Sequence, residues 1–402
     1  MSPFHNPNRQ VSSIRQALAQ DKKPLGLFLG AGCPLSIKNN TSETQKPLIP
    51  DIVGLTKIVC ERMESSHKMK KPFEVLLEHF NIDEHKNTNI EDILSHIRSL
   101  RVVAGKDSVR GLTAENLDSL DQEVCSIIVM VMKEELPENA TAYHRIATWI
   151  GATQRSIPVE LFTTNYDLLL EQALERQRVP YFDGFVGSYR AFFDPYAMEE
   201  DKLPPRWSRL WKLHGSINWY LDNSGLVYRS LNDAIGQRRV IHPSHLKYEQ
   251  SRKMPYLAMI DRLRAFLKEP SPFLIVCGYS FRDDHLNEVL VQGLEGNPNG
   301  VVFALIYKSL KDYPKAISLA EKRPNLNILA EDEAVIGTRR AGWTEKQDLS
   351  DFDRSPGVEW VLKEKQGGEG LRQSHFKLGD FTAFGDFLLD ITGVKEDTKS
   401  AK

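Results

Sequence analysis

Four short motifs in the sequence combine residue types that could bind and transform a small molecule. They are LFLGAGCPLS at 27–36, FTTNYD at 162–167, WKLHGSINW at 211–219 and CGYSFRDDHLN at 277–287. Each motif begins within or directly after a run of apolar residues that reads as a buried strand. Open parallel sheets bind ligands beyond the carboxyl ends of their strands, so each motif is a candidate for ligand binding.

The first motif contains a glycine turn, Gly30-Ala31-Gly32. Gly30 and Gly32 would let bare backbone approach a pyrophosphate, whose charge backbone N–H groups can meet. A tight turn between a strand and a helix needs the same glycines, so these residues leave both interpretations open. No third glycine stands at the position of the dinucleotide-binding fingerprint, which argues against an ordinary dehydrogenase.

The second motif places Asn165 and Asp167 at the carboxyl end of an expected strand. An amide and a carboxylate two residues apart could orient a water molecule and hold an amide-bearing ring. The same two residues could instead shape a turn between strand and helix, with Asp167 capping the helix that follows.

The third motif places His214 at a strand end, directly before Gly215. The ring could project into a cleft, and a histidine with a pKa near neutral is a natural general base. A partly buried histidine whose hydrogen bonds are satisfied is the alternative.

The fourth motif ends a buried strand at Gly278 and Ser280, which could contact a ribose or a phosphate. Asp283 and Asp284 follow at the start of a helix, where acidic residues act as caps. Together with His285 they could also hold a divalent metal in a nuclease site. The HPSH run at 242–245 could suggest a metal too, but loop histidines without further ligands are more often surface residues.

The elements that must position these motifs alternate between strand and helix after residue 157. Apolar strands that alternate with helices predict a parallel sheet with helices on both faces. Before this region, an amphipathic helix is expected over 9–20 and a buried strand runs into the glycine turn. We therefore predict an α/β fold built on a Rossmann-like parallel sheet.

Helical signals dominate from residue 51 to residue 155, between the first strand and the rest of the sheet. Asp51 can cap the first of these helices, and Thr88 with Glu91 offers a capping box for another over 88–100. This stretch predicts a helical insertion domain. We expect four parts: 1–50 for the N-terminal helix and the first strand and glycine turn of the Rossmann-like domain, 51–155 for the helical insertion, 156–331 for the remainder of the Rossmann-like domain, and 332–402 for a C-terminal segment with a possible role in assembly.

The charge balance suits a small-molecule substrate better than extensive DNA wrapping. Lysine and arginine total 52 against 54 aspartates and glutamates, so the formal net charge is −2. This excludes one large basic surface but not a local patch, and direct nucleic-acid binding stays open. The N-terminus carries no apolar signal segment and no apolar run is long enough to span a bilayer, so a soluble, cytoplasmic protein without membrane association is expected.

The cysteines are few and scattered. Cys33, Cys60, Cys125 and Cys277 form no CxxC pair. A structural zinc module and a disulfide framework are therefore not expected.

The motifs taken in order, GAG, TNYD, LHGS and GYS, resemble those of the sirtuin superfamily, in particular the sirtuin-like domains of bacterial antiphage defence proteins. The resemblance covers residues 24–330, with 51–155 alike only in being a helical insertion. It implies NAD as the substrate. Asn165 and Asp167 correspond to the Asn-x-Asp that grips the nicotinamide end of NAD, and His214 to the catalytic histidine.

The resemblance also assigns residues to the rest of the NAD molecule. Gly30, Ala31 and Gly32 match the glycine turn over the phosphates, and Gly278 with Ser280 would help to anchor the pyrophosphate and adenosine half. The segment IPD at 49–51 resembles an Ile-Pro-Asp of the family, which would bring Asp51 to the nicotinamide pocket.

Departures from the family pattern point away from lysine deacylation. Deacylases of this family carry a zinc module with paired CxxC motifs, and this chain has none. The Phe-Arg that usually follows Ile-Pro-Asp is replaced by Ile52 and Val53, and Cys33-Pro34 stands where many members have a small residue and serine. The pattern is similar to that of sirtuin-like enzymes that hydrolyse NAD to nicotinamide and ADP-ribose, so an NAD glycohydrolase (NADase) in antiphage defence is expected, without zinc.

The resemblance further implies how such an activity is restrained. Family members of this kind are commonly homo-oligomers that act with a partner, and the chain resembles the sirtuin-like subunit that assembles with a HerA-type hexameric ATPase. Three alternatives stay open: an NAD-dependent deacylase or ADP-ribosyltransferase, a non-catalytic module that binds NAD or ADP-ribose, and a nuclease subunit.

Overall fold

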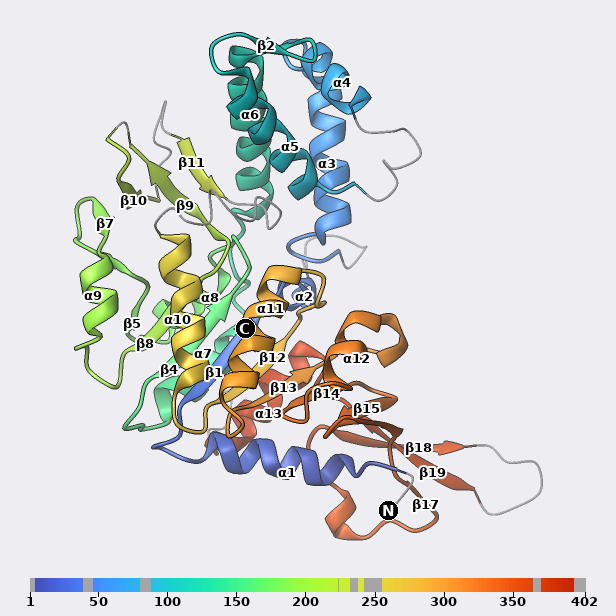
Figure 1. Cartoon of the computed structure of the whole chain (residues 1–402). Coiled ribbons are helices and arrows are strands. Elements are labelled where there is room, and N and C mark those ends of the chain that lie inside the picture. Colours follow the sequence, from blue (N-terminus) through green and yellow to red (C-terminus); the bar gives the residue numbers. More distant parts are fainter. Residues whose placement is uncertain are drawn as a thin grey trace, which may run out of the picture.

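The computed structural model describes residues 4–38, 46–79, 88–222, 224–231, 238–241, 255–363 and 370–393. The HPSH run at 242–245 lies outside these residues. A central sheet with helices on both faces carries a block of helices beyond one end of its strands, and a small sheet lies near the opposite end (Figure 1).

The central sheet has nine strands. In spatial order they are β16 (Arg339–Gly342), β15 (Glu333–Ile336), β14 (Leu326–Leu329), β13 (Val301–Leu305), β12 (Phe273–Cys277), β1 (Leu25–Leu29), β4 (Val159–Thr163), β8 (Ser208–Lys212) and β5 (Tyr181–Phe182). All neighbours from β14 to β5 pair in parallel, and β15 and β16 form an antiparallel margin. The central strands, such as FLIVC in β12, are buried along their whole length, as expected for a parallel sheet covered on both sides.

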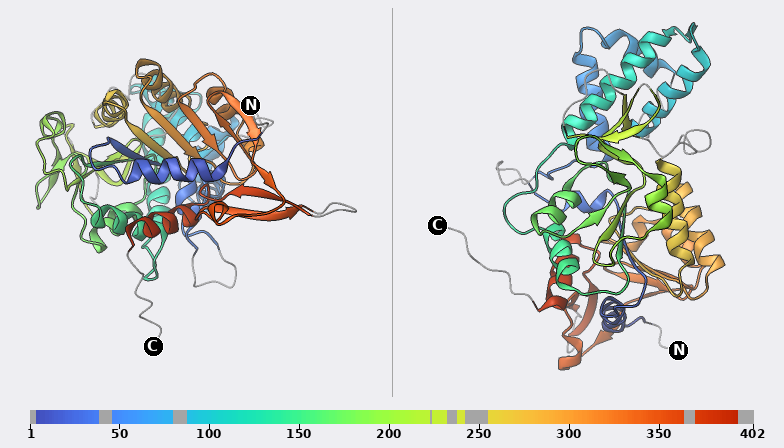
Figure 2. Two further views of the ribbon diagram at one scale, coloured as in Figure 1. Left: turned by 90° about the horizontal axis from the view of Figure 1, so that it is seen from below. Right: turned by 90° about the vertical axis from the view of Figure 1, so that its left-hand side faces the viewer.

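Helices cover both faces of the sheet, which confirms the predicted Rossmann-like α/β fold. Side chains alternate along β1, so Leu27 joins the core on one face and Phe28 the core on the other. The first face is covered by α1 (Pro7–Leu18), α7 (Ala142–Ala152), α8 (Leu169–Arg176) and α13 (Phe381–Thr392). The second is covered by α10 (Tyr256–Lys268), α11 (Asp284–Gly296) and α12 (Pro314–Ala320). Figure 2 shows the sheet between these two layers.

A block of helices projects beyond the carboxyl ends of the parallel strands (Figure 1). It consists of α3 (Ile52–Ser65), α4 (Lys70–Glu78), α5 (Ile90–Ala104) and α6 (Ala114–Met132), with a short hairpin of β2 (Ser108–Val109) and β3 (Leu112–Thr113) between the last two helices. We call α3–α6 the helical block. Helix α7 packs against α8 and α13 on the sheet, so the projecting part of the predicted insertion is α3–α6.

The cap of α5 differs from the predicted one. The Asn89 side chain accepts hydrogen bonds from the N–H groups of Glu91 and Asp92 at 2.8 and 3.2 Å, and the Asp92 carboxylate accepts from the Asn89 N–H at 3.0 Å. The capping box therefore uses Asn89 and Asp92 instead of Thr88 and Glu91, because asparagine caps a helix at least as well as threonine. The Glu91 carboxylate instead accepts a hydrogen bond from Tyr166.

The remaining elements extend the two ends of the molecule. A five-stranded antiparallel sheet is made of β6 (Phe185–Val186), β7 (Ala191–Phe193), β9 (Gly215–Leu221), β10 (Val227–Arg229) and β11 (Arg238–Ile241), with α9 (Pro195–Glu200) beside it. A three-stranded sheet near the opposite end contains β17 (Glu345–Lys346), β18 (Val358–Lys363) and β19 (Leu371–Phe376). Short helices are α2 (Gly32–Leu35), η1 (Leu310–Asp312) and η2 (Asp351–Asp353). Across the described ranges, the helices are too short or too polar to cross a membrane.

Candidate functional site

The four sequence motifs meet at one edge of the central sheet. Strands β12, β1, β4 and β8 are neighbours and run parallel. The register places Leu29 beside both Cys277 and Thr163, and it places Thr163 beside Lys212. The chain continues from β1 to β4 and β8 on one side and later returns to β12 on the other. This reversal of strand order is where open α/β sheets bind ligands, and the helical block lies over it.

The glycine turn after β1 packs against the loop after β12. The Gly30 N–H donates to the Cys277 carbonyl and the Gly32 N–H to the Gly278 carbonyl, both at 2.8 Å. A Cβ on Gly30 would lie only 2.5 Å from the Gly278 carbonyl oxygen. These glycines therefore have a packing role, because a side chain at either position would push the two loops apart. Ala31, between them, is exposed at the edge of the sheet.

Asn165 connects the loop after β4 to this glycine turn. Its buried side-chain amide donates to the Gly30 carbonyl at 3.2 Å. Its backbone N–H donates to the Thr163 hydroxyl at 3.0 Å, and that hydroxyl donates to the Leu29 carbonyl at 2.9 Å. The sheet edge thus brings together two of the predicted site residues, Asn165 and Gly30.

Asp167 is buried beside a lysine that the sequence motifs did not single out. One Asp167 oxygen accepts from the Leu169 N–H at 3.0 Å and so helps to start α8. The Lys212 ammonium, 2% exposed, donates to the Asp167 carbonyl and lies 2.9 Å from a Glu171 carboxylate oxygen. Burial raises the pKa of Asp167 to about 6, and the positive charge of Lys212 opposes this rise. The loop after β4 is therefore held by contacts among buried charged side chains.

Lys212 and Glu171 could have been noticed in the sequence from one signal. Lys212 interrupts the apolar run of β8, two residues before His214. A lysine in a strand buried on both faces needs a partner of opposite charge. The sequence shows that need but does not show which acidic residue fills it.

His214 pairs with Asp283 across the sheet edge. The Nε2 atom of His214 lies 3.1 Å from one Asp283 oxygen, and both side chains are largely buried. The other Asp283 oxygen accepts from the N–H groups of His285 and Leu286, so the same carboxylate also caps α11. Among the described residues, none hydrogen-bonds to the Nδ1 atom of His214.

Asp283 controls the charge state of this histidine. Burial alone would lower the pKa of His214, but the hydrogen bond and charge of Asp283, with a contribution from Glu91, outweigh burial and raise it. Burial would raise the pKa of Asp283, but its contact with His214 lowers it. The sequence identified Asp283 only as a cap, so its second role is a finding of the structure.

Replacing Asp283 with asparagine should therefore alter stability in a pH-dependent way. Asparagine keeps the cap but removes the charge that favours protonated His214. The raised pKa of His214 contributes stability below the unfolded value, and this contribution disappears as pH rises through the folded value. We expect Asp283→Asn to lower the midpoint of thermal unfolding at mildly acidic pH, and the difference from wild type to shrink above neutral pH. A pH-independent difference would contradict the pairing.

The loop that carries Asp283 is held in a strained conformation. Phe281 has a φ of +57° although it is a bulky residue, and its ring is fully buried. The Asn287 amide donates to the Phe281 carbonyl at 2.8 Å and accepts from the Tyr279 hydroxyl at 2.9 Å. Such strain persists only where surrounding contacts enforce it. Gly278, also at positive φ, and the exposed Ser280 belong to the same loop.

Asp51 lies apart from these contacts. It is exposed, and its carboxylate accepts from the Gly54 N–H at 2.8 Å, which caps α3 as the sequence predicts. Within the described ranges, no hydrogen bond or ion pair connects it to Asn165, Asp167 or His214.

The acidic pair at the start of α11 is split between two environments. Asp283 faces His214, whereas Asp284 forms an exposed ion pair with Lys315 at 2.7 Å. The described residues contain no group of three or more His, Cys, Asp or Glu side chains that could hold a metal ion. The four cysteines are free thiols.

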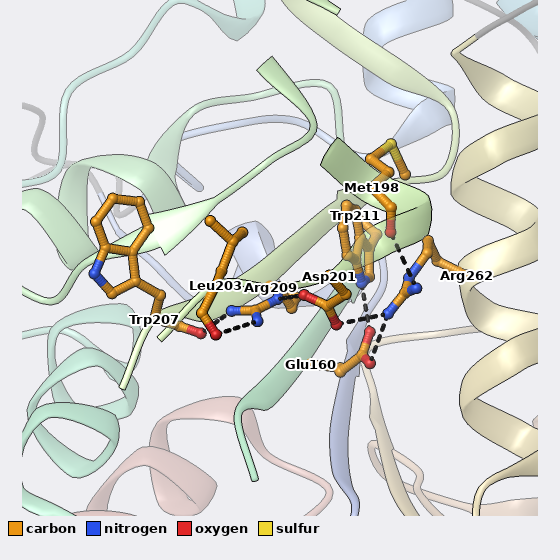
Figure 3. Close-up of polar contacts among 8 residues, drawn as sticks. All are labelled: Glu160, Met198, Asp201, Leu203, Trp207, Arg209, Trp211 and Arg262. Atoms are coloured by element: carbon orange, nitrogen blue, oxygen red, sulfur yellow. Dashed lines mark hydrogen bonds and ion pairs between the residues drawn. The ribbon is translucent and has the colours of Figure 1, made fainter. Parts of the chain in front are cut away.

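Below the site, a buried charged network ties β4 and β8 to their neighbours (Figure 3). Glu160 accepts from the Trp211 indole N–H at 2.5 Å and lies 3.4 Å from Arg262. Arg262 also reaches Asp201 at 3.2 Å, and Asp201 pairs with Arg209 at 2.5 Å. The network joins α10 and the segment after α9 to β8, which leads to Lys212 and His214.

A pocket of about 690 Å³ lies at the other end of β8. Trp207, which lines it, directly precedes β8, whereas His214 follows the strand. The pocket lining includes aromatic and charged side chains from around β5, β6 and β10. The lining residues are Glu175, Arg178, Val179, Pro180, Tyr181, Phe182, Asp183, Phe185, Val186, Gly187, Ala197, Leu203, Trp207 and Arg229. None of the predicted site residues is among them, so this pocket is separate from the sheet edge.

Residues 159–328 match the family model of the SIR2-like domain. The matched segment runs from β4 into β14 and contains the TNYD, LHGS and GYS motifs, while the glycine turn and the helical block precede it. A comparison with curated proteins finds no match. The match supports a sirtuin-like protein with an NAD-related activity, and the parallel sheet flanked by helices is consistent with this fold.

Proposed function

We propose that the protein hydrolyses NAD at the sheet edge where β1, β4, β8 and β12 end. One observation carries this proposal. Within a segment that matches the SIR2-like domain, Asn165 and the His214–Asp283 pair occupy the same edge, at the reversal of strand order. SIR2-like domains use NAD, and this edge offers an amide and a histidine whose Nδ1 atom can take up a proton.

The chemistry of NAD cleavage suits these groups. Nicotinamide leaves the cationic pyridinium form of NAD as a neutral ring, so its departure needs little acid catalysis. The C–N bond to the ribose breaks through an oxocarbenium-like transition state, and a water oxygen forms the new bond to that carbon. His214 accepts the proton that the water loses, and the products are nicotinamide, ADP-ribose and a proton.

Asp283 acts on this step through His214. Its carboxylate holds the imidazole by Nε2 and stabilises the imidazolium that forms, as carboxylates do in other histidine pairs. Asn165 positions the water or the ribose hydroxyls. Asp167 helps to hold the carboxamide.

The rest of the NAD molecule follows the same edge of the sheet. In this proposal, the turn Gly30-Ala31-Gly32 lies against the phosphates, with the N–H groups of Gly30 and Gly32 engaged by the Cys277 and Gly278 carbonyls. Gly278 and Ser280 contact the pyrophosphate and adenosine half. The exposed positions of Ala31 and Ser280 support this path.

The proposal is tested by incubating purified protein with NAD and quantifying the products by mass spectrometry. We expect equal amounts of nicotinamide and ADP-ribose from the wild type and none from Asn165→Ala. Asn299→Ala is the matched control, because Asn299 is exposed in a loop after α11. Turnover of acyl-lysine peptides, transfer of ADP-ribose to protein, or binding of NAD without turnover would each replace this proposal with one of its alternatives.

The pH dependence of cleavage should report two groups. The proposed base His214 must be neutral, and Asp167, with a pKa of about 6, must be ionised to hold the carboxamide. Activity should thus fall in two steps as pH decreases, the second near pH 6. Lys212→Met removes the charge that opposes the rise of the Asp167 pKa, so the second step should move to higher pH. Lys315→Met, which removes an exposed lysine, should leave both steps unchanged. An unshifted pH profile in Lys212→Met would contradict the role of ionised Asp167 in holding the carboxamide.

We further propose that the activity belongs to antiphage defence in the cytoplasm and is restrained by assembly. The proposed assembly is a homo-oligomer with a HerA-type hexameric ATPase as its partner, as the sirtuin-like resemblance implies. Co-expression with such an ATPase, followed by co-purification and NAD turnover with and without it, tests this point. A chain that senses phage alone would refute the need for a partner.

A further inference from the structure

Glu91, in the first turn of helix α5 of the helical block, places its carboxylate at the sheet edge. The Tyr166 hydroxyl donates to Glu91 Oε1 at 3.2 Å, across 75 positions of sequence. Tyr166 stands between Asn165 and Asp167, so this hydrogen bond joins the helical block to the centre of the TNYD motif.

The Tyr166 ring lies beside the ring of His214, the proposed base. The ring centroids of Tyr166 and His214 are 6.4 Å apart with an interplanar angle of 38°. The Tyr166 carbonyl accepts from the Ile217 N–H at 3.0 Å and from the Ser216 hydroxyl at 3.4 Å. Tyr166 is therefore held at its backbone by β9 and at its hydroxyl by Glu91.

Glu91 is itself held firmly within the helical block. It lies in the first turn of α5, where the helix dipole favours a negative side chain. The capping box of Asn89 and Asp92 fixes that turn, and the Ile90 N–H donates to the Thr56 hydroxyl of α3 at 2.9 Å. Movement of the helical block would therefore move the Glu91 carboxylate relative to the sheet.

We propose that Glu91 is a positioning residue for His214, acting through Tyr166. The position of the helical block relative to the sheet then determines whether His214 is held in place for catalysis. This inference rests on the proposed function. It gives the helical block a role in catalysis without contact between its residues and the reacting atoms.

The charges around His214 support this role. Asp283 from the start of α11 and Glu91 from α5 both raise the pKa of His214, and Asp283 has the larger effect. Burial and the neighbouring Glu91 raise the pKa of Tyr166 well above its usual value, so its hydroxyl stays protonated and donates to Glu91. Loss of Glu91 would thus remove both the acceptor for Tyr166 and part of the charge that favours protonated His214.

The test combines a titration of Glu91→Gln, which removes only the charge, with kinetics for Glu91→Leu, which also removes the acceptor, for Tyr166→Phe and for the double variant Glu91→Leu/Tyr166→Phe. The His214 ring is titrated by NMR, with its signal assigned from its loss in His214→Ala. We expect Glu91→Gln to lower the His214 pKa. We also expect Glu91→Leu and Tyr166→Phe each to lower kcat for NAD cleavage about five- to tenfold at little cost in KM, and the double variant to be no worse than either, because both remove the same interaction.

The matched control is Glu115→Gln, which changes an exposed acidic residue in the first turn of α6. It should alter neither the titration nor kcat. An unchanged His214 titration in Glu91→Gln, or additive losses in the double variant, would overturn the inference. If the wild type releases no nicotinamide, the proposed function is wrong, and the titration alone still decides whether Glu91 acts on His214.

Discussion

His214→Ala is expected to lower the rate of NAD cleavage by about 10²- to 10⁴-fold, the range that general acid–base catalysis contributes. The imidazole is held by Asp283 at 3.1 Å and presents its other nitrogen for proton transfer. Removing it leaves water without a base but leaves the backbone of the four loops in place. NAD affinity should therefore change little, and the loss should fall on kcat. Nicotinamide release measured over a range of NAD concentrations separates the two.

A second histidine provides the control for this variant. His67 is exposed near the end of α3, so His67→Ala should match the wild type in both kcat and KM. Near-normal cleavage by His214→Ala would exclude His214 as the base, and the edge of the sheet would need another group for that role.

Arg209→Met is expected to reduce the free energy of unfolding by about 3 kcal/mol or more. The Arg209 side chain is 2% exposed and lies 2.5 Å from Asp201. It also donates to the carbonyls of Trp207 and Leu203. Methionine fills similar space but removes the donor from two part-buried carbonyls and leaves Asp201 with Arg262 as its remaining partner in the network. Urea unfolding measures the difference.

An exposed arginine–aspartate ion pair is the matched comparison. Arg264 pairs with Asp261 at 2.8 Å on the surface of α10, and both side chains are at least 36% exposed. Arg264→Met should cost less than about 1 kcal/mol, as surface ion pairs usually do. Equal losses in Arg209→Met and Arg264→Met would show that the network in Figure 3 does not stabilise β8.

The sequence predicts the sheet and its edge well because both depend on local pattern. Apolar runs mark β1, β4, β8 and β12, and each ends in a polar or glycine motif. Since parallel strands end on the same side of a sheet, the motifs had to share an edge once the strands became neighbours. Strand order itself is set by tertiary packing, and the structure supplies it.

The contacts that complete the site could not be read from the sequence. Asp283 looks like a helix cap because it is one, and nothing local shows that its second oxygen meets His214. Glu91 looks like part of a capping box, but Asn89 competes better for the helix end. The pairs Tyr166–Glu91 and Lys212–Glu171 join residues far apart in the chain. Where a side chain has two possible partners, tertiary packing determines which one it contacts, and the spacing of residues in the sequence does not.

If the protein hydrolyses NAD as proposed, NAD binds along the sheet edge where the loops after β1, β4, β8 and β12 meet. Hydrogen–deuterium exchange of His214→Ala, with and without NAD, tests it most directly, because this variant is expected to bind NAD without consuming it. We expect slower exchange in 30–36, 163–168, 213–217 and 278–283, with little change around Trp207 and the separate pocket. Protection at that pocket, or no protection at the four loops at saturating NAD, would contradict it.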